Sequence, residues 1–85
     1  LGALFAGKVM EPYVVTVEPS LTELHLNSHP GQEFTYVLSG VLRLTVGDHA
    51  LVLAPGDSVY FDSATPHGMQ AEGPGPATFL AVITA

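Results

Sequence analysis

Three residues have the side chains and spacing of a metal site. His29 and Glu33 are separated by Pro30-Gly31-Gln32, a turn that could swing the carboxylate back towards the imidazole, and His67 occurs later in the chain. Imidazole and carboxylate are the usual ligands of iron, manganese, nickel and zinc, and two His with one carboxylate form the facial triad of non-heme iron sites. The spacing predicts a divalent metal site with positions open to a small molecule.

The same three residues could instead line a polar, hydrogen-bonded interior that holds no metal. Asn27 is expected beside them, either as a ligand through its carbonyl oxygen or in a water-bridged position. His25 lies two residues further upstream, about 6.6 Å away at a strand rise of about 3.3 Å per residue. His25 is therefore either a half-buried, hydrogen-bonded histidine or a further ligand. We assign no catalytic residue, because the chain shows no obvious general base besides these groups.

The elements that must position these residues are short strands. Glycine and proline recur so often that segments of five to eight residues remain between turns, which suits strands and is too short for helices. Eight segments rich in Val, Leu, Thr and aromatic residues are predicted as strands, namely residues 13–18, 21–28, 33–38, 41–46, 50–53, 58–61, 66–71 and 77–84. Ser39-Gly40 and Gly47-Asp48 are predicted as hairpin turns, and residues 54–57 as a further turn.

This many short antiparallel strands can protect their edges by closing into a barrel or by stacking as a two-sheet jelly roll. Both arrangements enclose an interior. We therefore predict an all-β fold of about eight short antiparallel strands whose interior binds a small molecule.

Composition limits the architecture and the partners. With 85 residues the chain is one domain, in which residues 10–84 form the barrel and residues 1–9 an N-terminal extension or interface segment. Two basic against eight acidic residues give a formal charge of −6, which excludes direct contact with nucleic acid by this chain. There is no cysteine, no leader pattern and no apolar run near the roughly 20 residues of a membrane span. We expect a cytoplasmic protein without membrane contact.

A domain of this size buries only about 60% of its unfolded surface, and oligomerisation often supplies the missing stability. Within residues 21–28, Leu24 and Leu26 alternate with His25 and Asn27. If the polar face lines the barrel, the leucines face outward and mark an interface. The sequence thus predicts a homodimer, to which an N-terminal apolar set contributes: Leu4, Phe5, Val9 and Met10.

Two segments resemble the paired motifs of the cupin family. Residues 29–40, HPGQEFTYVLSG, are similar to the first motif, in which His, Glu and Gly follow at this spacing. Residues 55–67, PGDSVYFDSATPH, are similar to the second, and fifteen residues separate Gly40 from Gly56. The resemblance implies a small double-stranded β-helix, the cupin jelly-roll barrel, over residues 10–84. It also implies a divalent metal (Fe, Mn, Ni or Zn) held by His29, Glu33 and His67.

The chain departs from the family pattern at four positions. Asn27 stands where the first motif has a histidine, and a neutral amide oxygen is a poorer transition-metal ligand than imidazole. Asp62 and Ala64 stand where the second motif has Pro and Gly, and Ala71 where it has Asn. The implied ligand set is therefore reduced to the three residues His29, Glu33 and His67.

A narrower resemblance concerns three phrases: residues 10–13 (MEPY), 36–40 (YVLSG), and 56–62 (GDSVYFD) with the following Pro66-His67-Gly68. They are similar to the C-terminal cupin domain of XRE-type helix-turn-helix transcriptional regulators. This implies a small-molecule sensor domain of a bacterial regulator, which reaches DNA only through a head absent from these 85 residues.

Two other function classes stay open. One is a free-standing metal-dependent cupin enzyme, such as a non-heme dioxygenase or an isomerase, and the other is a structural dimerisation domain. Lys8 and Arg43 are the only cations that could hold an anionic substrate. This scarcity favours binding over catalysis.

Overall fold

A computed structural model of the protein describes residues 10–19 and 24–84, which are folded entirely from strands and connections. The strands are β1 (Met10–Val17), β2 (Gln32–Ser39), β3 (Leu42–Val46), β4 (His49–Leu53), β5 (Ser58–Asp62), β6 (His67–Ala71) and β7 (Ala77–Thr84). The all-β prediction is confirmed. No helix capable of crossing a membrane occurs in these two described parts.

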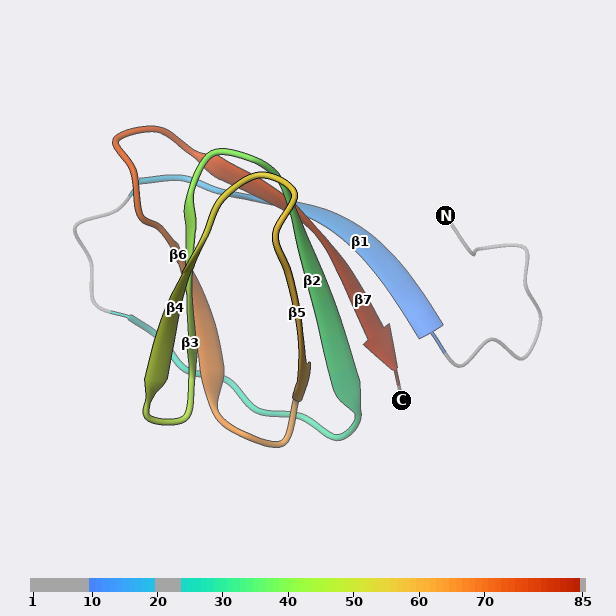
Figure 1. The fold of residues 1–85 in the computed structure, drawn as a ribbon. Helices are drawn as coiled ribbons and strands as arrows, with labels where there is room; N and C mark the ends of the chain where they lie inside the picture. Colours follow the sequence, from blue (N-terminus) through green and yellow to red (C-terminus); the bar gives the residue numbers. More distant parts are fainter. Residues whose placement is uncertain (1–9, 20–23, 85) are drawn as a thin grey trace.

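The strands form two facing antiparallel sheets (Figure 1). One sheet has four strands in the order β1-β7-β2-β5, and the other has three in the order β4-β3-β6. Of the consecutive strands described, β3 and β4 pair with each other, while the other neighbours in sequence do not. The chain therefore passes repeatedly between the two layers, as in a jelly roll.

Two predicted turns behave differently. Gly47-Asp48 closes the β3–β4 hairpin, as expected. Ser39-Gly40 instead carries the chain from β2 in the four-stranded sheet to β3 in the three-stranded sheet, so its prediction as a hairpin is wrong. Gly40 has a φ of 73°, and a Cβ atom there would overlap the carbonyl group of Pro76. A turn residue shows that the chain reverses, but it does not show which sheet the next strand joins.

The segment predicted as a strand over residues 21–28 differs from the expectation. Residues 20–23 lie outside the described parts, and residues 24–26 form no regular structure. Asn27 makes one isolated antiparallel bridge to His67. The described residues thus contain seven strands, and the expected alternation of 24–28 does not run along a paired strand.

The core lies between the inner faces of the two sheets. Its buried apolar members are Val37, Leu42, Leu44, Leu53, Phe61, Ala77, Phe79 and Ala81. Strand β2 contributes Glu33, Thr35 and Val37 to this inner side, and all three are buried. Its alternate residues point outward and are exposed. The inner face of β2 thus combines polar and apolar groups, and its polar end becomes the site.

Candidate metal centre

Backbone hydrogen bonds tie two loops together beneath the site. Asn27 and His67 each donate a backbone N–H to the other's carbonyl oxygen at 2.8 Å. The His29 N–H donates to Ser63 O, and the Ser63 N–H donates to Gly31 O, both at 3.0 Å. Gly31 has a φ of 103°, which lets the chain turn into β2. These hydrogen bonds hold the segment that contains His29 beside the start of the strand that contains His67.

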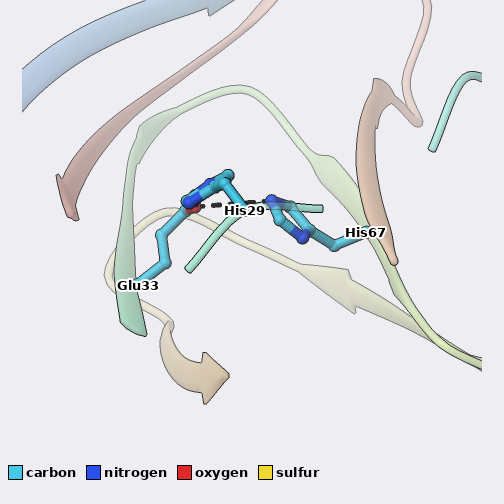
Figure 2. A group of neighbouring side chains, drawn as sticks. All are labelled: His29, Glu33 and His67. Carbon is cyan, nitrogen blue, oxygen red and sulfur yellow. Dashed lines mark ion pairs between the residues drawn. The ribbon is translucent and has the colours of Figure 1, made fainter. Parts of the chain in front are cut away.

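His29 and Glu33, which flank one turn, converge with His67 from a later part of the chain. Glu33 projects from the inner face of β2, His67 is the first residue of β6 in the opposite sheet, and His29 precedes the turn into β2. Figure 2 shows the two rings and the carboxylate pointing toward one another. The ligand atoms lie within 4.8 Å of one another. Glu33 Oε1 is 3.6 Å from His29 Nε2 and 3.5 Å from His67 Nε2.

The site is closed on the core side and open on the other. The side chains of Glu33 and His67 are 5% and 6% exposed, whereas that of His29 is 36% exposed. The ring of Phe61 packs on His67 with a centroid distance of 4.9 Å, and the two imidazoles meet edge to face at 5.2 Å. A small molecule would therefore reach the site past His29.

The hydrogen bonds of the imidazoles decide which nitrogen faces the carboxylate. His67 Nδ1 lies 2.9 Å from Thr65 O, and His29 Nδ1 lies 3.2 Å from Pro30 O. A carbonyl oxygen only accepts, so Nδ1 donates, and in a neutral ring the lone pair is on Nε2. Both Nε2 atoms face Glu33 Oε1 at distances beyond the usual 2.7–3.2 Å of a hydrogen bond. All three candidate ligand atoms lie within 4.8 Å of one another, so one cation could be shared among them.

The geometry of these donors fits a divalent metal. At metal–ligand distances of about 2.0–2.2 Å, two ligands of one tetrahedral ion lie roughly 3.4 Å apart. The two distances to Glu33 Oε1, 3.5 and 3.6 Å, are close to this separation. Two imidazoles and a carboxylate suit iron, manganese, nickel and zinc alike. The assignment of the three residues as metal ligands is a prediction that this geometry supports.

The two further candidates occupy different positions. Asn27 lines the cavity beside His29, Glu33 and His67, as expected of a neighbouring residue. His25 is exposed and lies outside both this cluster and the cavity lining. Residues two apart, such as His25 and Asn27, point to the same side only in a regular strand. Residues 24–26 do not form one, so His25 does not follow Asn27 toward the cavity.

A cavity of about 480 Å³ opens beside the three residues. Its lining is Tyr13, Val15, Asn27, His29, Glu33, His67, Met69, Phe79, Ala81 and Ile83. Sequence reasoning missed the contribution of β1, although Tyr13 and Val15 alternate there with outward-facing residues. The Tyr13 hydroxyl donates a 2.7 Å hydrogen bond to Glu11, and this bond raises the pKa of Tyr13. Tyr13 is therefore a neutral hydrogen-bonding group near neutral pH and not a base.

Comparison with known families agrees with the two-layer fold and the clustered residues. The sequence pattern of the family described as "Cupin domain" matches residues 13–83. The chain belongs to the cupin family. Its jelly-roll fold is the cupin barrel predicted above.

Several solved structures are similar to this cupin chain. Iron(II) HppE in complex with substrate superposes with a TM-score of 0.79 and 32% identity, over 88% of this chain and 45% of that chain. Hydroxypropylphosphonic acid epoxidase from S. wedmorenis superposes with 0.79 and 30%, over 88% and 43%. The conserved SPY1581 protein of unknown function from Streptococcus pyogenes gives 0.77 and 21%, over 91% and 65%, a likeness of fold alone.

The cupin chain spans less than half the length of the first two of these proteins. No curated protein matches the chain significantly.

Proposed function

We propose that this cupin domain binds a divalent metal through His29, Glu33 and His67, and a small molecule at the positions that these residues leave open. The observation that carries the proposal is the approach of His29 Nε2 and His67 Nε2 to the buried Glu33 carboxylate, at 3.6 and 3.5 Å. The metal would supply positive charge for oxygen atoms of the ligand. The protein itself holds the three donors in place through the loop frame and shields them from water on the core side.

The cavity wall favours a ligand with little charge. Val15, Met69, Phe79, Ala81 and Ile83 make most of it apolar, and no described lining residue is Lys or Arg. Arg43, on β3, is bound to Glu72 through two hydrogen bonds of 2.9 Å. A dianion that enters this cavity would lose its hydration, and the bound metal would be the only positive charge beside it among the described lining. Such a transfer costs several kcal/mol. We therefore propose a small molecule with oxygen donors, a hydrocarbon part and at most one negative charge.

The role that we propose for this binding is that of a sensor domain of a bacterial transcriptional regulator. Three observations support it: the resemblance of residues 10–13, 36–40 and 56–62 to regulator cupins, the acidic composition, and the absence of a further base among the described cavity residues. DNA would be bound by a head outside these 85 residues, in the cytoplasm.

The second candidate is a metal-dependent enzyme. It is favoured by the similarity of 30–32% identity to structures described as iron(II) HppE with substrate. The coding sequence upstream of Leu1 separates the two. An encoded helix-turn-helix segment supports the sensor, and a start codon near Leu1 supports the free-standing enzyme.

The four histidines provide a matched test of the metal site, because two lie in the cluster and two do not. Untagged protein purified without chelator is analysed for its elements and then titrated with Co(II). We expect His29→Ala and His67→Ala each to lower the affinity for Co(II) more than about 100-fold, beyond the 10–100-fold of second-sphere changes. His25→Ala and His49→Ala should leave it within twofold. Equal effects of all four variants, or none, would contradict the site.

The ligand class is tested separately on the cobalt-loaded chain. The probes are 2-hydroxyhexanoate, with one negative charge and a hydrocarbon tail, and 2-hydroxypropylphosphonate, with up to two. We expect 2-hydroxyhexanoate to perturb the cobalt absorption at a concentration at least tenfold lower. The opposite order would refute the ligand class while leaving the metal site intact.

A further inference from the structure

The outer face of the four-stranded sheet carries two continuous apolar rows. Strand register aligns Pro12 with Val82, Val82 with Phe34, and Phe34 with Tyr60. Two residues further along each strand, a second row aligns Val14 with Leu80 and Leu80 with Tyr36. These side chains point away from the cavity, because their neighbours Tyr13, Glu33 and Ala81 line it. Each row thus crosses at least three strands without a charged residue.

Polar residues border these rows at both ends. The row beyond Phe34 contains Thr84, Gln32 and Asp62, with Met10 at its edge. Beyond Tyr36 lie Thr16 and Thr78, whose hydroxyls are 3.0 Å apart, and Ser39. The Tyr60 hydroxyl donates to Gln32 at the border of the face. An apolar centre within a polar rim is the usual anatomy of a protein interface.

The size of this face corresponds to that of an interface. Its large exposed members are Met10, Val14, Phe34, Tyr36, Leu38 and Tyr60. Since one aromatic side chain offers about 150–250 Å² and these six residues keep on average about half of their surface exposed, the face amounts to roughly 600 Å². This equals the largest patches found on typical monomers, about 300–600 Å². It also supplies most of the roughly 800 Å² per partner that a stable dimer buries.

We propose that this outer face is the interface of a homodimer in which two copies of the chain pack sheet against sheet. The distribution of charge on this face is compatible with a second copy of the chain as the partner. The two central rows are neutral, so a chain of net charge −6 can meet itself there without opposing charges in the centre. Asp62, an acidic rim residue, lies on the edge strand β5 at one corner of the face, outside the two central rows. Two twisted sheets pack face to face at about −30°.

This assignment moves the predicted interface to another surface. The sequence predicts it at Leu24 and Leu26. Leu26 is exposed as expected, but neither residue belongs to a strand and Leu24 packs near Gly68. Met10, also expected to contribute, lies on the outer face at its rim. Leu4, Phe5 and Val9 lie outside the described residues.

Two valines of nearly equal exposure test the assignment. Val14 on β1 is 60% exposed on the proposed interface, and Val52 on β4 is 55% exposed on the outer side of the other sheet, beside Arg43. The metal-loaded chain and its variants are compared by sedimentation equilibrium from 1 to 100 micromolar, with circular dichroism as the check of folding. We expect the unmodified chain to be dimeric at tens of micromolar. Val14→Glu should weaken the dimer at least 100-fold, and Val52→Glu less than threefold.

Three results of the sedimentation experiment would contradict or relocate the interface. A monomeric unmodified chain would overturn it and leave the face to another partner. A dimer that resists Val14→Glu, or that Val52→Glu weakens equally, would place the interface elsewhere. If Val14→Glu prevents folding, single cysteines are introduced instead, which the cysteine-free chain allows without background. Leu80→Cys, on the central strand β7 of the face, should then be cross-linked by a short bismaleimide and Val52→Cys should not. No cross-link at position 80, or an equal one at position 52, would refute the face.

Discussion

Residues 33–36 of β2 reverse the usual distribution of polarity between the two faces of the four-stranded sheet. On the inner side of β2, Glu33 and Thr35 are buried, while on its outer side Phe34 and Tyr36 are exposed. Polar residues are ordinarily outside and large apolar ones inside. A buried carboxylate is retained where it has a ligand or a charge partner, and an exposed apolar face where a partner covers it. The same strand therefore carries the proposed metal site on one side and the proposed interface on the other.

The largest contrast is expected in folding stability between adjacent residues of β7. Phe79 is buried between the sheets, and Leu80 is on the outer face. Phe79→Ala should lower the free energy of unfolding by about 3–5 kcal/mol, because it leaves a cavity in the core. Leu80→Ala should act mainly through association, so its effect should vanish on dilution. Urea unfolding at two protein concentrations measures both, and a dilution-independent loss of similar size for Leu80→Ala would remove the distinction.

The next contrast concerns metal affinity and separates Glu33 from its neighbour Phe34. Glu33→Gln keeps the shape of the side chain but removes its charge, and should lower Co(II) affinity more than about 100-fold. Phe34→Leu, on the opposite face, should leave the affinity unchanged within twofold. Competition with a coloured chelator gives both values. If Glu33→Gln binds the metal normally, the carboxylate is not a ligand.

A smaller effect is expected at Thr35. Among the residues that the structure describes, its buried hydroxyl has no hydrogen-bond partner, as is also the case for Ser63. Thr35→Val removes an uncompensated buried polar group and should stabilise the metal-free chain by up to about 1 kcal/mol. For a domain of this size this corresponds to a rise in melting temperature of roughly 4–8 °C. Scanning calorimetry measures it, and a clear fall in the melting temperature would mean that the hydroxyl has a polar partner in solution.

The smallest effect is expected at the solvent-exposed Arg43–Glu72 pair on the three-stranded sheet side. The hydrogen bonds that the Glu72 carboxylate accepts from Arg43 lower the pKa of Glu72 from the ordinary 4.5. The contribution of the pair to stability is therefore fully present above pH 4.5 and is lost as the pH falls through the lowered value. Glu72→Gln should reduce the melting temperature only slightly at pH 7. Between pH 7 and pH 3 the melting temperature of this variant should then fall less than that of the unmodified chain. Melting curves at pH 7 and 3 test this, with Asp48→Asn as the matched control.

Much of the fold could be predicted from local signals, and the exceptions have physical causes. Strand β1 begins at Met10 and not at Tyr13 because Pro12, which lacks an N–H, is tolerated on an edge strand. The crossing at Ser39-Gly40 could not be predicted, since sheet membership depends on strands distant in sequence. The segment 24–28 carries a strand-like alternation, yet its described part makes a single bridge, at Asn27.

The candidate metal site was more predictable than the proposed interface. His29, Glu33 and His67 have a distinctive spacing, and the turn at Pro30-Gly31 returns the chain as expected. The apolar outer face has no such signature, because Phe34, Tyr36 and Leu38 alternate with Thr35 and Val37 in a strand that is largely apolar throughout. Only the register with β7 and β5 shows that these side chains form continuous rows.

The bridge between Asn27 and His67 has a consequence for how such a domain could evolve. Because it is made by main-chain atoms alone, it places few demands on the side chain at position 27. That side chain lines the cavity next to the three candidate ligands. A single-base change from Asn to His could therefore add a fourth donor without disturbing the supporting loops. Selection could in this way retune metal preference at one codon while the fold and the outer face stay constant.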